Sequence, residues 1–217
     1  MSDLEAARNH QKIFLQGLKD KKEPYLVNVQ GVDITVHPGV FPPVTDSQLL
    51  ASHISVSSGT KVLDLTTGSG VFAVIAGIQG AKGLAADINP AAVVNAKENF
   101  ERFGVGFKAL QSDLFNNVHG GGFDLITVNG PYTEGKVIDP LEHAFYGARR
   151  FLTRLFSEAS EYLDPEGKML ITFAEWGEVD FLEKTASSNN FTLKFLDKKF
   201  SDNKRVYRLY EAMLNLH

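Results

Sequence analysis

The sequence contains no cysteine among its 217 residues. This absence excludes disulfide bonds, a thiolate nucleophile and cysteine-ligated metal sites, and it suits a reducing compartment. Long hydrophobic runs are also missing, because the longest, Val71 to Ala76, is far shorter than the roughly 20 residues that span a bilayer. The first residues are charged, whereas a secretory signal needs an apolar stretch. We therefore predict a cytoplasmic protein with no membrane partner.

The chain also lacks an excess of positive charge. Its 22 Lys and Arg residues are outnumbered by 26 Asp and Glu residues, which gives a formal net charge of −4. Duplex DNA and ribosomal RNA are held through many phosphate contacts, so this balance argues against a nucleic-acid partner. None of the six histidines lies at metal-ligand spacing with a second ligand, and we predict no metal site.

The composition is otherwise that of an ordinary globular protein, with 43% hydrophobic and 22% charged residues. A length of 217 residues favours one compact domain with small additions. We place the boundary between addition and main domain at residue 58. Residues 1–58 are expected to form a helix, a β-hairpin and a second helix, and residues 59–217 are expected to form the main domain. The sequence does not indicate an oligomeric state.

Hydrophobic periodicity defines the elements of the N-terminal segment. Apolar residues at helical spacing predict a short amphipathic helix at residues 4–18. Two alternating segments within residues 25–36 predict a β-hairpin. A helix should follow Pro43, because Thr45 or Asp46 can cap its first turn.

Beyond Lys61, short apolar segments alternate with helical stretches, which is the pattern of βαβ units around a parallel sheet. The last two strands are joined by a link too short for a parallel crossover, so the final strand should pair antiparallel. We therefore predict an α/β, Rossmann-like fold with a mostly parallel seven-stranded sheet. The expected strands cover residues 62–65, 83–87, 108–111, 123–128, 169–173, 192–196 and 205–213, and the expected helices cover residues 70–78, 90–103, 144–163 and 179–188.

A glycine-rich turn follows the first strand of this sheet and leads into a helix. The residues of the strand end and the turn are Asp64, Thr66, Thr67, Gly68, Ser69 and Gly70. Glycines at such a turn let a ligand approach the backbone closely, while exposed amides and the helix dipole favour an anionic group. The turn therefore predicts a site for a nucleotide-type cofactor.

Acidic residues end the next two strands. Asp87, 19 residues after Gly68, ends the second strand, where a carboxylate can accept both hydroxyls of a ribose. Asp113 ends the third, where a carboxylate could receive an exocyclic adenine amine. A nicotinamide cofactor fits part of the pattern too, because Gly68, Gly70 and Ala73 satisfy the relaxed dinucleotide spacing.

The end of the fourth strand favours a different cofactor. Its residues are Asn129, Gly130, Pro131 and Tyr132. Here the sequence resembles the class I S-adenosylmethionine (SAM) methyltransferases, and within them the amino-group branch whose motif is Asn or Asp, Pro, Pro, then an aromatic residue. The resemblance covers about residues 25–213. It is strongest for the glutamine N5-methyltransferases that modify release factors, which share the hairpin, the Phe41-Pro42-Pro43 segment and the motif at the strand end.

The resemblance implies SAM as the cofactor, with its ribose on Asp87, its adenine near Asp113 and Leu114, and the acceptor nitrogen at Asn129. It implies a small molecule or a protein side chain as the acceptor. The cofactor-binding residues implied are Asp64, Thr66, Thr67, Gly68, Ser69, Gly70, Asp87, Ile88, Asn89, Asp113, Leu114, Phe115 and Asn129. The catalytic residues implied are Asn129, Gly130, Pro131 and Tyr132.

The chemistry of a planar amide or amine agrees with this assignment. Its nitrogen lone pair is delocalised, and acceptors that hold both N–H groups weaken the delocalisation and aim the lone pair. The Asn129 side-chain oxygen and the Gly130 carbonyl can be those acceptors. Tyr132 could lie against a flat acceptor while its hydroxyl stays solvated.

Two residues depart from the pattern of the family. Thr66 stands where a glycine is common, and a threonine is tolerated there if its φ is negative. Gly130 replaces the first proline of the motif, which predicts a loop that is looser or shaped for a different acceptor. Glu142 and His143 could reach an acceptor, although the pattern favours a solvated helix start for them, and Trp176 could either line the acceptor pocket or pack in the core.

The leading hypothesis is therefore a SAM-dependent N-methyltransferase, and three alternatives stay open. A looser loop could let SAM cyclise on itself or donate its aminocarboxypropyl group. The chain could be a non-catalytic SAM-binding partner of another protein. An NAD-dependent oxidoreductase is the fourth hypothesis. The spacing of Tyr132 and Lys136 resembles the catalytic pair of short-chain dehydrogenases, but Pro131 and Gly135 disfavour the helix that this pair requires.

Overall fold

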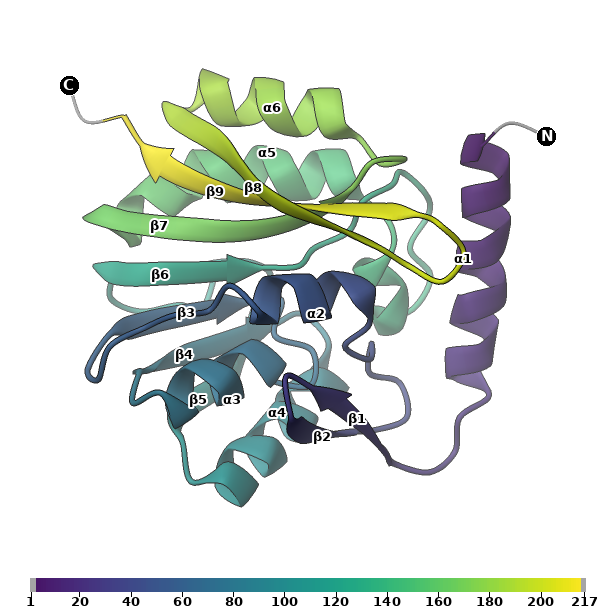
Figure 1. The fold of residues 1–217 in the computed structure, drawn as a ribbon, viewed down its shortest axis with the longest axis horizontal. Helices are drawn as coiled ribbons and strands as arrows, with labels where there is room; N and C mark the ends of the chain where they lie inside the picture. The colour runs from purple at the N-terminus through teal and green to yellow at the C-terminus, as the bar shows by residue number, and fades with distance from the viewer. Residues whose placement is uncertain (1–2, 216–217) are drawn as a thin grey trace.

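A central seven-stranded sheet with helices on both faces forms most of the protein (Figure 1). The structure is a computed structural model that describes residues 3–215, with side chains described from Asn9 onward in the first helix. The charged start of the chain at Met1 and Ser2, and His217 among the histidines considered above, lie outside the described residues.

The sheet has the strand order β5-β4-β3-β6-β7-β9-β8. Neighbours from β5 to β7 are parallel, whereas β9 runs antiparallel to both β7 and β8. The predicted fold is confirmed, including the antiparallel last strand. The strands are β3 (Lys61–Leu65), β4 (Lys82–Asp87), β5 (Gly106–Gln111), β6 (Phe123–Val128), β7 (Leu163–Ala174), β8 (Phe191–Phe200) and β9 (Val206–Leu214).

Strand β3 is the point at which the connections of the sheet change direction. It pairs with β4 on one side and with β6 on the other, so the chain first winds toward one edge and then returns to build the other half. In open parallel sheets, ligands bind in the crevice that opens at the carboxyl ends of the strands at such a point. The topology therefore locates a site beyond the ends of β3, β4 and β6.

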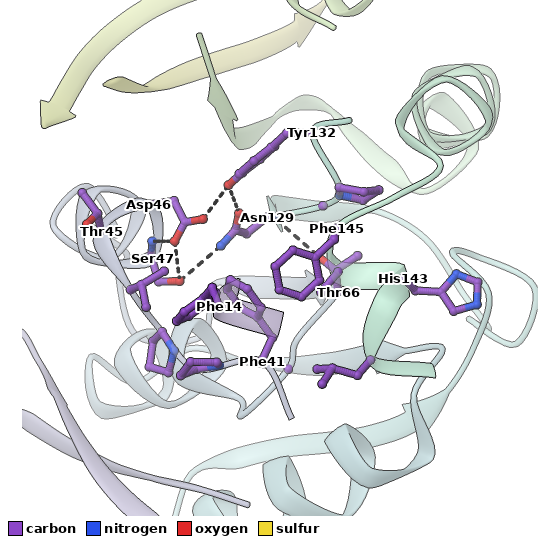
Figure 2. A pocket seen from close by; sticks show the side chains of 18 of the residues that line it. Phe14, Phe41, Thr45, Asp46, Ser47, Thr66, Asn129, Tyr132, His143 and Phe145 are labelled. Atoms are coloured by element: carbon purple, nitrogen blue, oxygen red, sulfur yellow. Dashed lines mark hydrogen bonds between the residues drawn. The ribbon is translucent and has the colours of Figure 1, made fainter. Parts of the chain in front are cut away.

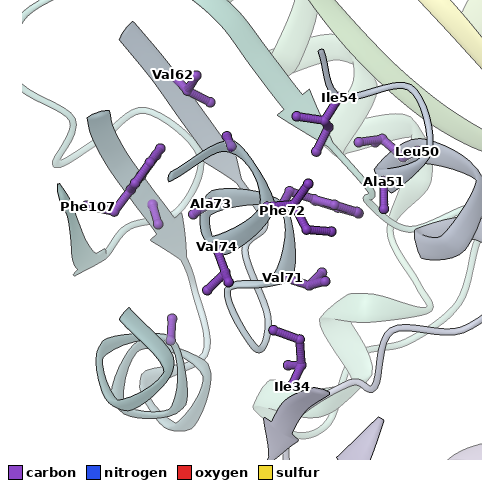
Figure 3. Close-up of a cluster of buried hydrophobic side chains, with 14 of the residues drawn as sticks. Ile34, Leu50, Ala51, Ile54, Val62, Val71, Phe72, Ala73, Val74 and Phe107 are labelled. Atoms are coloured by element: carbon purple, nitrogen blue, oxygen red, sulfur yellow. The ribbon is translucent and has the colours of Figure 1, made fainter. Parts of the chain in front are cut away.

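Helices cover the sheet because each carries an apolar face. Val71 to Ala76 in α3 are all buried between the sheet, α2 and α4 (Figure 3). The hairpin of β1 and β2 adds Ile34 to this cluster, so the N-terminal segment and the main domain share one core. One face carries α2 (Thr45–Ala51), α3 (Val71–Ile78), α4 (Pro90–Phe103), β1 (Tyr25–Val29) and β2 (Val32–Val36), and the other carries α5 (Ala148–Glu158) and α6 (Val179–Ser188).

The helix predicted for residues 144–163 is wrong in its extent. A separate 3-10 turn, η1 (Pro140–Ala144), precedes α5, and Gly147 between them has a φ of +93° that interrupts helical geometry. After a second short turn, η2 (Ala159–Glu161), Leu163 pairs with Phe123 and begins β7. Pairing in the sheet therefore overrides helical propensity at the end of the predicted segment.

Helix α1 (Asp3–Lys19) stands across the carboxyl-end edge of the sheet, beside the tip of the β8–β9 hairpin (Figure 1). At its end, Lys19 donates to Glu142 over 2.8 Å and also pairs with Asp139. Earlier in the same helix, Phe14 packs edge-on against Phe41. These contacts hold α1 over the carboxyl ends of the strands.

Candidate functional site

A cavity of about 380 Å³ lies beneath α1, at the carboxyl ends of β3, β4 and β6 (Figure 2). The turns after these three strands contribute Gly68, Asp87 and Asn129 to its lining. Residues 44–47 at the start of α2 line it from the opposite side. The three groups that the sequence predicted at separate strand ends thus face one hollow.

The glycine turn after β3 depends on backbone conformations that favour glycine. Gly68 and Gly70 have φ values of +54° and +84°. A Cβ atom at Gly70 would lie 2.7 Å from the ring of Phe100, so only glycine lets α4 pack so closely. Gly68 has no such neighbour and borders the cavity, where its N–H donates to the Asp87 carboxylate over 2.8 Å. Close packing against α4 therefore explains the glycine at residue 70, whereas access for a ligand explains the glycine at residue 68.

Thr66 does not have the negative φ under which a threonine is readily tolerated. Its φ is +68°, a left-handed conformation that costs a β-branched residue about 1–3 kcal/mol. Two hydrogen bonds hold it there. The Thr66 hydroxyl donates to the carbonyl of Leu65 and accepts from the backbone N–H of Asn129 over 3.2 Å. Thr66 thereby links the turn after β3 directly to the turn after β6.

Asp64 lies behind the turn and is not among the residues that line the cavity. The side chain is fully buried and accepts from the hydroxyls of Thr67 and Thr127 over 2.6 and 2.8 Å, and from the N–H of Ala73 over 3.3 Å. Burial raises the pKa of Asp64 to about 6, and these hydrogen bonds oppose the shift. Asp64 therefore fixes the conformation of the glycine turn through these hydrogen bonds.

We expect Asp64 to make the free energy of unfolding fall as the pH rises from about 4 to about 6. Over this range the folded protein keeps a proton that the unfolded chain has already released, so raising the pH removes a stabilising difference. The shift corresponds to about 3 kcal/mol. Urea unfolding at several pH values measures the slope, and Asp64→Asn should flatten it. An unchanged slope in Asp64→Asn would contradict this account of the buried carboxyl.

Asp87 occupies the junction between the main cavity and a smaller one of about 180 Å³. One carboxylate oxygen accepts from the N–H of Gly68 and the other from the N–H of Asn89 over 2.9 Å. Burial raises the pKa of Asp87, while these two backbone N–H groups oppose the rise. Each oxygen keeps a further lone pair, so the carboxylate can still accept from a ligand. Ile88 lines both cavities beside it.

The smaller cavity lies between the ends of β4 and β5 and contains the predicted Asp113 and Leu114. Asp113 pairs with Arg154 over 2.9 Å and with Arg150 over 3.2 Å. Phe115, also predicted at the cofactor site, is not among the residues that line either cavity. It is buried in the core and stacks on Tyr162 with ring centroids 4.5 Å apart.

At the end of β6, Asn129 and Tyr132 belong to one buried network. The Asn129 side-chain oxygen accepts from the hydroxyl of Thr172 over 2.8 Å and lies within hydrogen-bond distance of the Tyr132 hydroxyl. The expectation of a solvated Tyr132 hydroxyl is wrong, because the residue is 6% exposed and its hydroxyl also lies 2.7 Å from the Asp46 carboxylate. The ring packs edge-on against Phe173. Tyr132 therefore lines the cavity and contacts the Asn129 side chain with its buried hydroxyl.

Asp46 and Ser47 are functional candidates that the sequence analysis missed. Asp46 was expected as a helix cap, but α2 has Val44 at its N-cap position with no side-chain cap. The Asp46 side chain instead accepts from Ser47 and Tyr132, and the Ser47 hydroxyl accepts from Asn129 over 3.2 Å (Figure 2). In the sequence, an acidic residue next to a serine is the only signal for the part that these two residues play in the network.

Aromatic rings form the outer wall of the main cavity. Phe145 lies 5.4 Å from Phe41 between ring centroids, and Trp176 lies 5.0 Å from Tyr207, each pair in an edge-on arrangement. Trp176 therefore lines the cavity, which is one of the two positions predicted for it. His143 also borders the cavity, whereas the Glu142 side chain is buried and pairs with Lys19.

The sequence of residues 31–201 matches the Methyltransferase small domain family. The chain belongs to this family. It is a SAM-dependent methyltransferase, which confirms the predicted enzyme class and cofactor. The family gives no support to the NAD-dependent oxidoreductase or to the non-catalytic partner.

Relatives of this methyltransferase differ in acceptor. A protein of Methanocaldococcus jannaschii that is named for N5-glutamine methylation is 36% identical over 154 residues, which are 67% of this chain and 78% of that protein. Ribosomal RNA small subunit methyltransferase C of Chromohalobacter salexigens is 30% identical over 191 residues, which are 82% of this chain and 51% of that protein. The net-charge argument against nucleic acid therefore stays a prediction.

A solved structure shows the same fold. A 16S rRNA N2 methyltransferase of T. thermophilus, in complex with AdoMet and guanosine, has a TM-score of 0.66 at 22% identity. The match covers 89% of this chain and 50% of that one. This methyltransferase thus spans most of the length of the archaeal relative but about half that of the two ribosomal RNA enzymes.

The structure also explains why this methyltransferase has glycine at residue 130. A Cβ atom at Gly130 would lie 2.4 Å from the ring of Phe151, which fills the space that a proline ring would need. The residue is buried against that ring. Phe151 supplies the constraint that a proline supplies in the family motif.

Gly130→Pro is expected to destabilise the fold by about 1–3 kcal/mol, because overpacking forces the Phe151 ring and the backbone apart. Urea unfolding measures the loss. Combining the change with Phe151→Ala provides space for the proline ring, so the proline should cost less in that background than in the wild type. An equal cost in both backgrounds would show that Phe151 is not the constraint.

Two absences hold for residues 3–215. No helix in this range is long and apolar enough to cross a membrane. No group of three or more metal-ligating side chains in the same range is placed to hold a metal ion.

Proposed function

We propose that this methyltransferase methylates the side-chain amide nitrogen of a glutamine in a protein acceptor. The observation that carries the proposal is the position of Asn129 at the edge of the cavity, where Thr172 holds its side-chain oxygen and Ser47 holds its side-chain nitrogen. The relative from M. jannaschii, named for N5-glutamine methylation, supports the same acceptor.

The shape of the two joined cavities supports a binding mode for SAM. They share Thr66, Asp87 and Ile88, so an elongated ligand can extend from one into the other. Adenine would lie in the smaller cavity near Asp113 and Leu114. The ribose hydroxyls would donate to Asp87, and the methionine portion would lie over the turn at Gly68. SAM supplies a methyl group on a positively charged sulfur, which an acceptor nitrogen attacks in line.

The residues of the strand end would then orient the acceptor. An amide nitrogen is a weak nucleophile, because its lone pair is delocalised into the carbonyl. The Asn129 side-chain oxygen and the Gly130 carbonyl would each accept one of its N–H groups, which turns the lone pair toward the cofactor. Attack on the sulfonium removes positive charge, so alignment contributes more than a strong base would.

The aromatic wall suits the rest of a glutamine side chain. Phe14, Phe41 and Phe145 provide apolar surface for methylene groups. The same surface excludes water, which would otherwise compete for the N–H acceptors of the site.

The boundary at residue 58 then separates two tasks, and we extend the proposal to them. Residues 59–217 would hold the cofactor and supply Asn129. Residues 1–58 would supply the acceptor side, because Phe14, Phe41 and Asp46 come from this segment and line the cavity.

Methyl-labelled SAM and fractionated cell extract provide the test. The purified enzyme is expected to label a protein, and mass spectrometry of the labelled peptide should place the methyl group on a glutamine. Label in RNA and none in protein would overturn the proposal. Incubation with SAM alone is the control, because consumption of SAM without acceptor would instead support cyclisation or transfer of the aminocarboxypropyl group.

A further inference from the structure

Asp46 is a buried carboxylate to which two hydrogen-bond chains of the site lead. Its Oδ1 accepts from the backbone N–H of Ser47 over 2.6 Å, and the Ser47 hydroxyl lies 3.2 Å from the same atom. Its Oδ2 lies 2.7 Å from the Tyr132 hydroxyl. Both Ser47 and Tyr132 also contact the Asn129 side chain (Figure 2). Asp46 therefore reaches Asn129 through two intermediates and through a direct side-chain hydrogen bond, without touching the acceptor.

Counting protons fixes the direction of the first chain. The Asn129 Nδ2 group can only donate, and it lies 3.2 Å from the Ser47 hydroxyl oxygen. Ser47 thus accepts from Asn129 and gives its own single proton to Asp46. This direction sets the orientation of the Asn129 amide, because it places the nitrogen toward Ser47 and the oxygen toward Thr172.

The second chain decides whether the Asn129 oxygen is available. The Tyr132 hydroxyl has one proton and lies within hydrogen-bond distance of both Asp46 Oδ2 and Asn129 Oδ1. An ionised carboxylate is the stronger acceptor, so the proton goes to Asp46. The Asn129 oxygen then accepts from Thr172 and keeps one lone pair for an incoming N–H group.

We propose that Asp46 is a positioning residue that draws the Tyr132 proton away from Asn129 and so frees the Asn129 oxygen for the acceptor nitrogen. This inference rests on the proposed role of Asn129 and adds a residue from the N-terminal segment to it. With a neutral group at residue 46 the second chain reverses. Tyr132 then donates to the Asn129 oxygen and occupies the lone pair that the acceptor needs.

The hydrogen-bond geometry around residue 46 predicts that Asp46→Asn redirects the Tyr132 proton to Asn129. The backbone N–H of Ser47 requires an oxygen opposite it, so the new amide places its NH2 group opposite Tyr132. The NH2 group donates to the tyrosine oxygen, and the tyrosine proton turns to Asn129. Without the tyrosine hydroxyl, the new amide at residue 46 has no effect on Asn129 by this route.

The groups that face Asp46 allow a pH readout. Tyr132 follows β6, Tyr207 lies on β9 with Arg205 before it, and His10 on α1 lines the same cavity. Burial, and then the Asp46 charge, raises the pKa of Tyr207, and the same two causes raise the pKa of Tyr132, so both stay protonated at neutral pH.

His10 is the remaining titratable group of this set. Burial and Arg205 lower its pKa, so it becomes charged only at more acid pH. Burial raises the pKa of Asp46, and the hydrogen bonds from Tyr132 and Ser47 oppose the rise. Lowering the pH therefore protonates Asp46 and should lower kcat, and this acid loss should be smaller in Tyr132→Phe.

A double-mutant cycle tests the inference. The four proteins are the wild type, Asp46→Asn, Tyr132→Phe and the double variant, assayed for kcat and for the KM of SAM. Asp46→Asn is expected to lower kcat by about 100-fold in the wild type, with the KM of SAM little changed. In the Tyr132→Phe background, which should retain measurable turnover, the same change should cost less than about 5-fold.

Equal costs of Asp46→Asn in the two backgrounds would overturn the inference and leave glutamine methylation intact. Label on an acceptor other than glutamine in the wild type would overturn the proposed function, and the cycle would be run on that acceptor. If Asp46→Asn does not fold, the acid loss of kcat in the wild type against Tyr132→Phe tests the same point.

NMR gives a readout that needs no turnover. The Asn129 side-chain amide signal, assigned by its loss in Asn129→Ala, should shift as Asp46 is protonated, and this shift should be smaller in Tyr132→Phe. An equal shift in both proteins would overturn the inference.

Discussion

Replacing Asn129 with alanine is expected to lower kcat by at least about 100-fold while the affinity for SAM stays within a few-fold of the wild type. The side-chain oxygen is held by Thr172 and its nitrogen by Ser47, so the group is fixed before the acceptor arrives. Its removal takes away one of the two acceptors that would orient the amide nitrogen. Steady-state kinetics and isothermal titration with SAM measure the two effects separately.

The matched control for this change is Asn117→Ala. Asn117 is exposed, lies outside both cavities and donates to a backbone carbonyl, so its loss should leave turnover unchanged. Full turnover in Asn129→Ala would refute the role of this side chain. Loss of SAM binding together with turnover would place Asn129 in the cofactor site instead.

Replacing Asp87 with alanine is expected to raise the dissociation constant of SAM by about 100-fold. The carboxylate lies where the two cavities join, and it would accept both ribose hydroxyls while it holds the N–H of Gly68. Its loss removes ligand contacts and loosens the glycine turn at the same time. Isothermal titration measures the change directly.

Asp124→Ala serves as the control for Asp87→Ala. Asp124 also accepts from a backbone N–H, that of Lys61, but it lies near the opposite ends of β3 and β6 and outside both cavities. Its replacement should leave SAM affinity unchanged. Equal SAM affinities for the wild type and Asp87→Ala would show that the ribose does not bind to this carboxylate.

The parts of the site that lie at strand ends could be predicted from the sequence. Gly68, Asp87 and Asn129 each follow an apolar strand, and the carboxyl ends of neighbouring parallel strands meet at one edge of a sheet. The motif around Asn129 added the enzyme class. Local pattern and sheet topology together were sufficient for these residues.

Residues that depend on contacts distant in sequence could not be predicted in this way. Asp46 meets Tyr132 across 86 residues, from a helix outside the repeating strand and helix pattern. Gly130 looked like a loss of rigidity, because nothing in the sequence places Phe151 against it. Thr66 takes a positive φ, and its hydroxyl accepts from the backbone N–H of Asn129, which is distant in the sequence. In each case a tertiary contact decides what the local sequence leaves open.

A crystal structure with S-adenosylhomocysteine, the demethylated cofactor, tests the central claim most directly. The account predicts the ribose hydroxyls on Asp87, the adenine beside Leu114, and the sulfur in the main cavity facing Asn129. Such a structure would also show whether the aromatic wall stays open for an acceptor. A cofactor bound elsewhere, or a sulfur directed away from Asn129, would contradict the account.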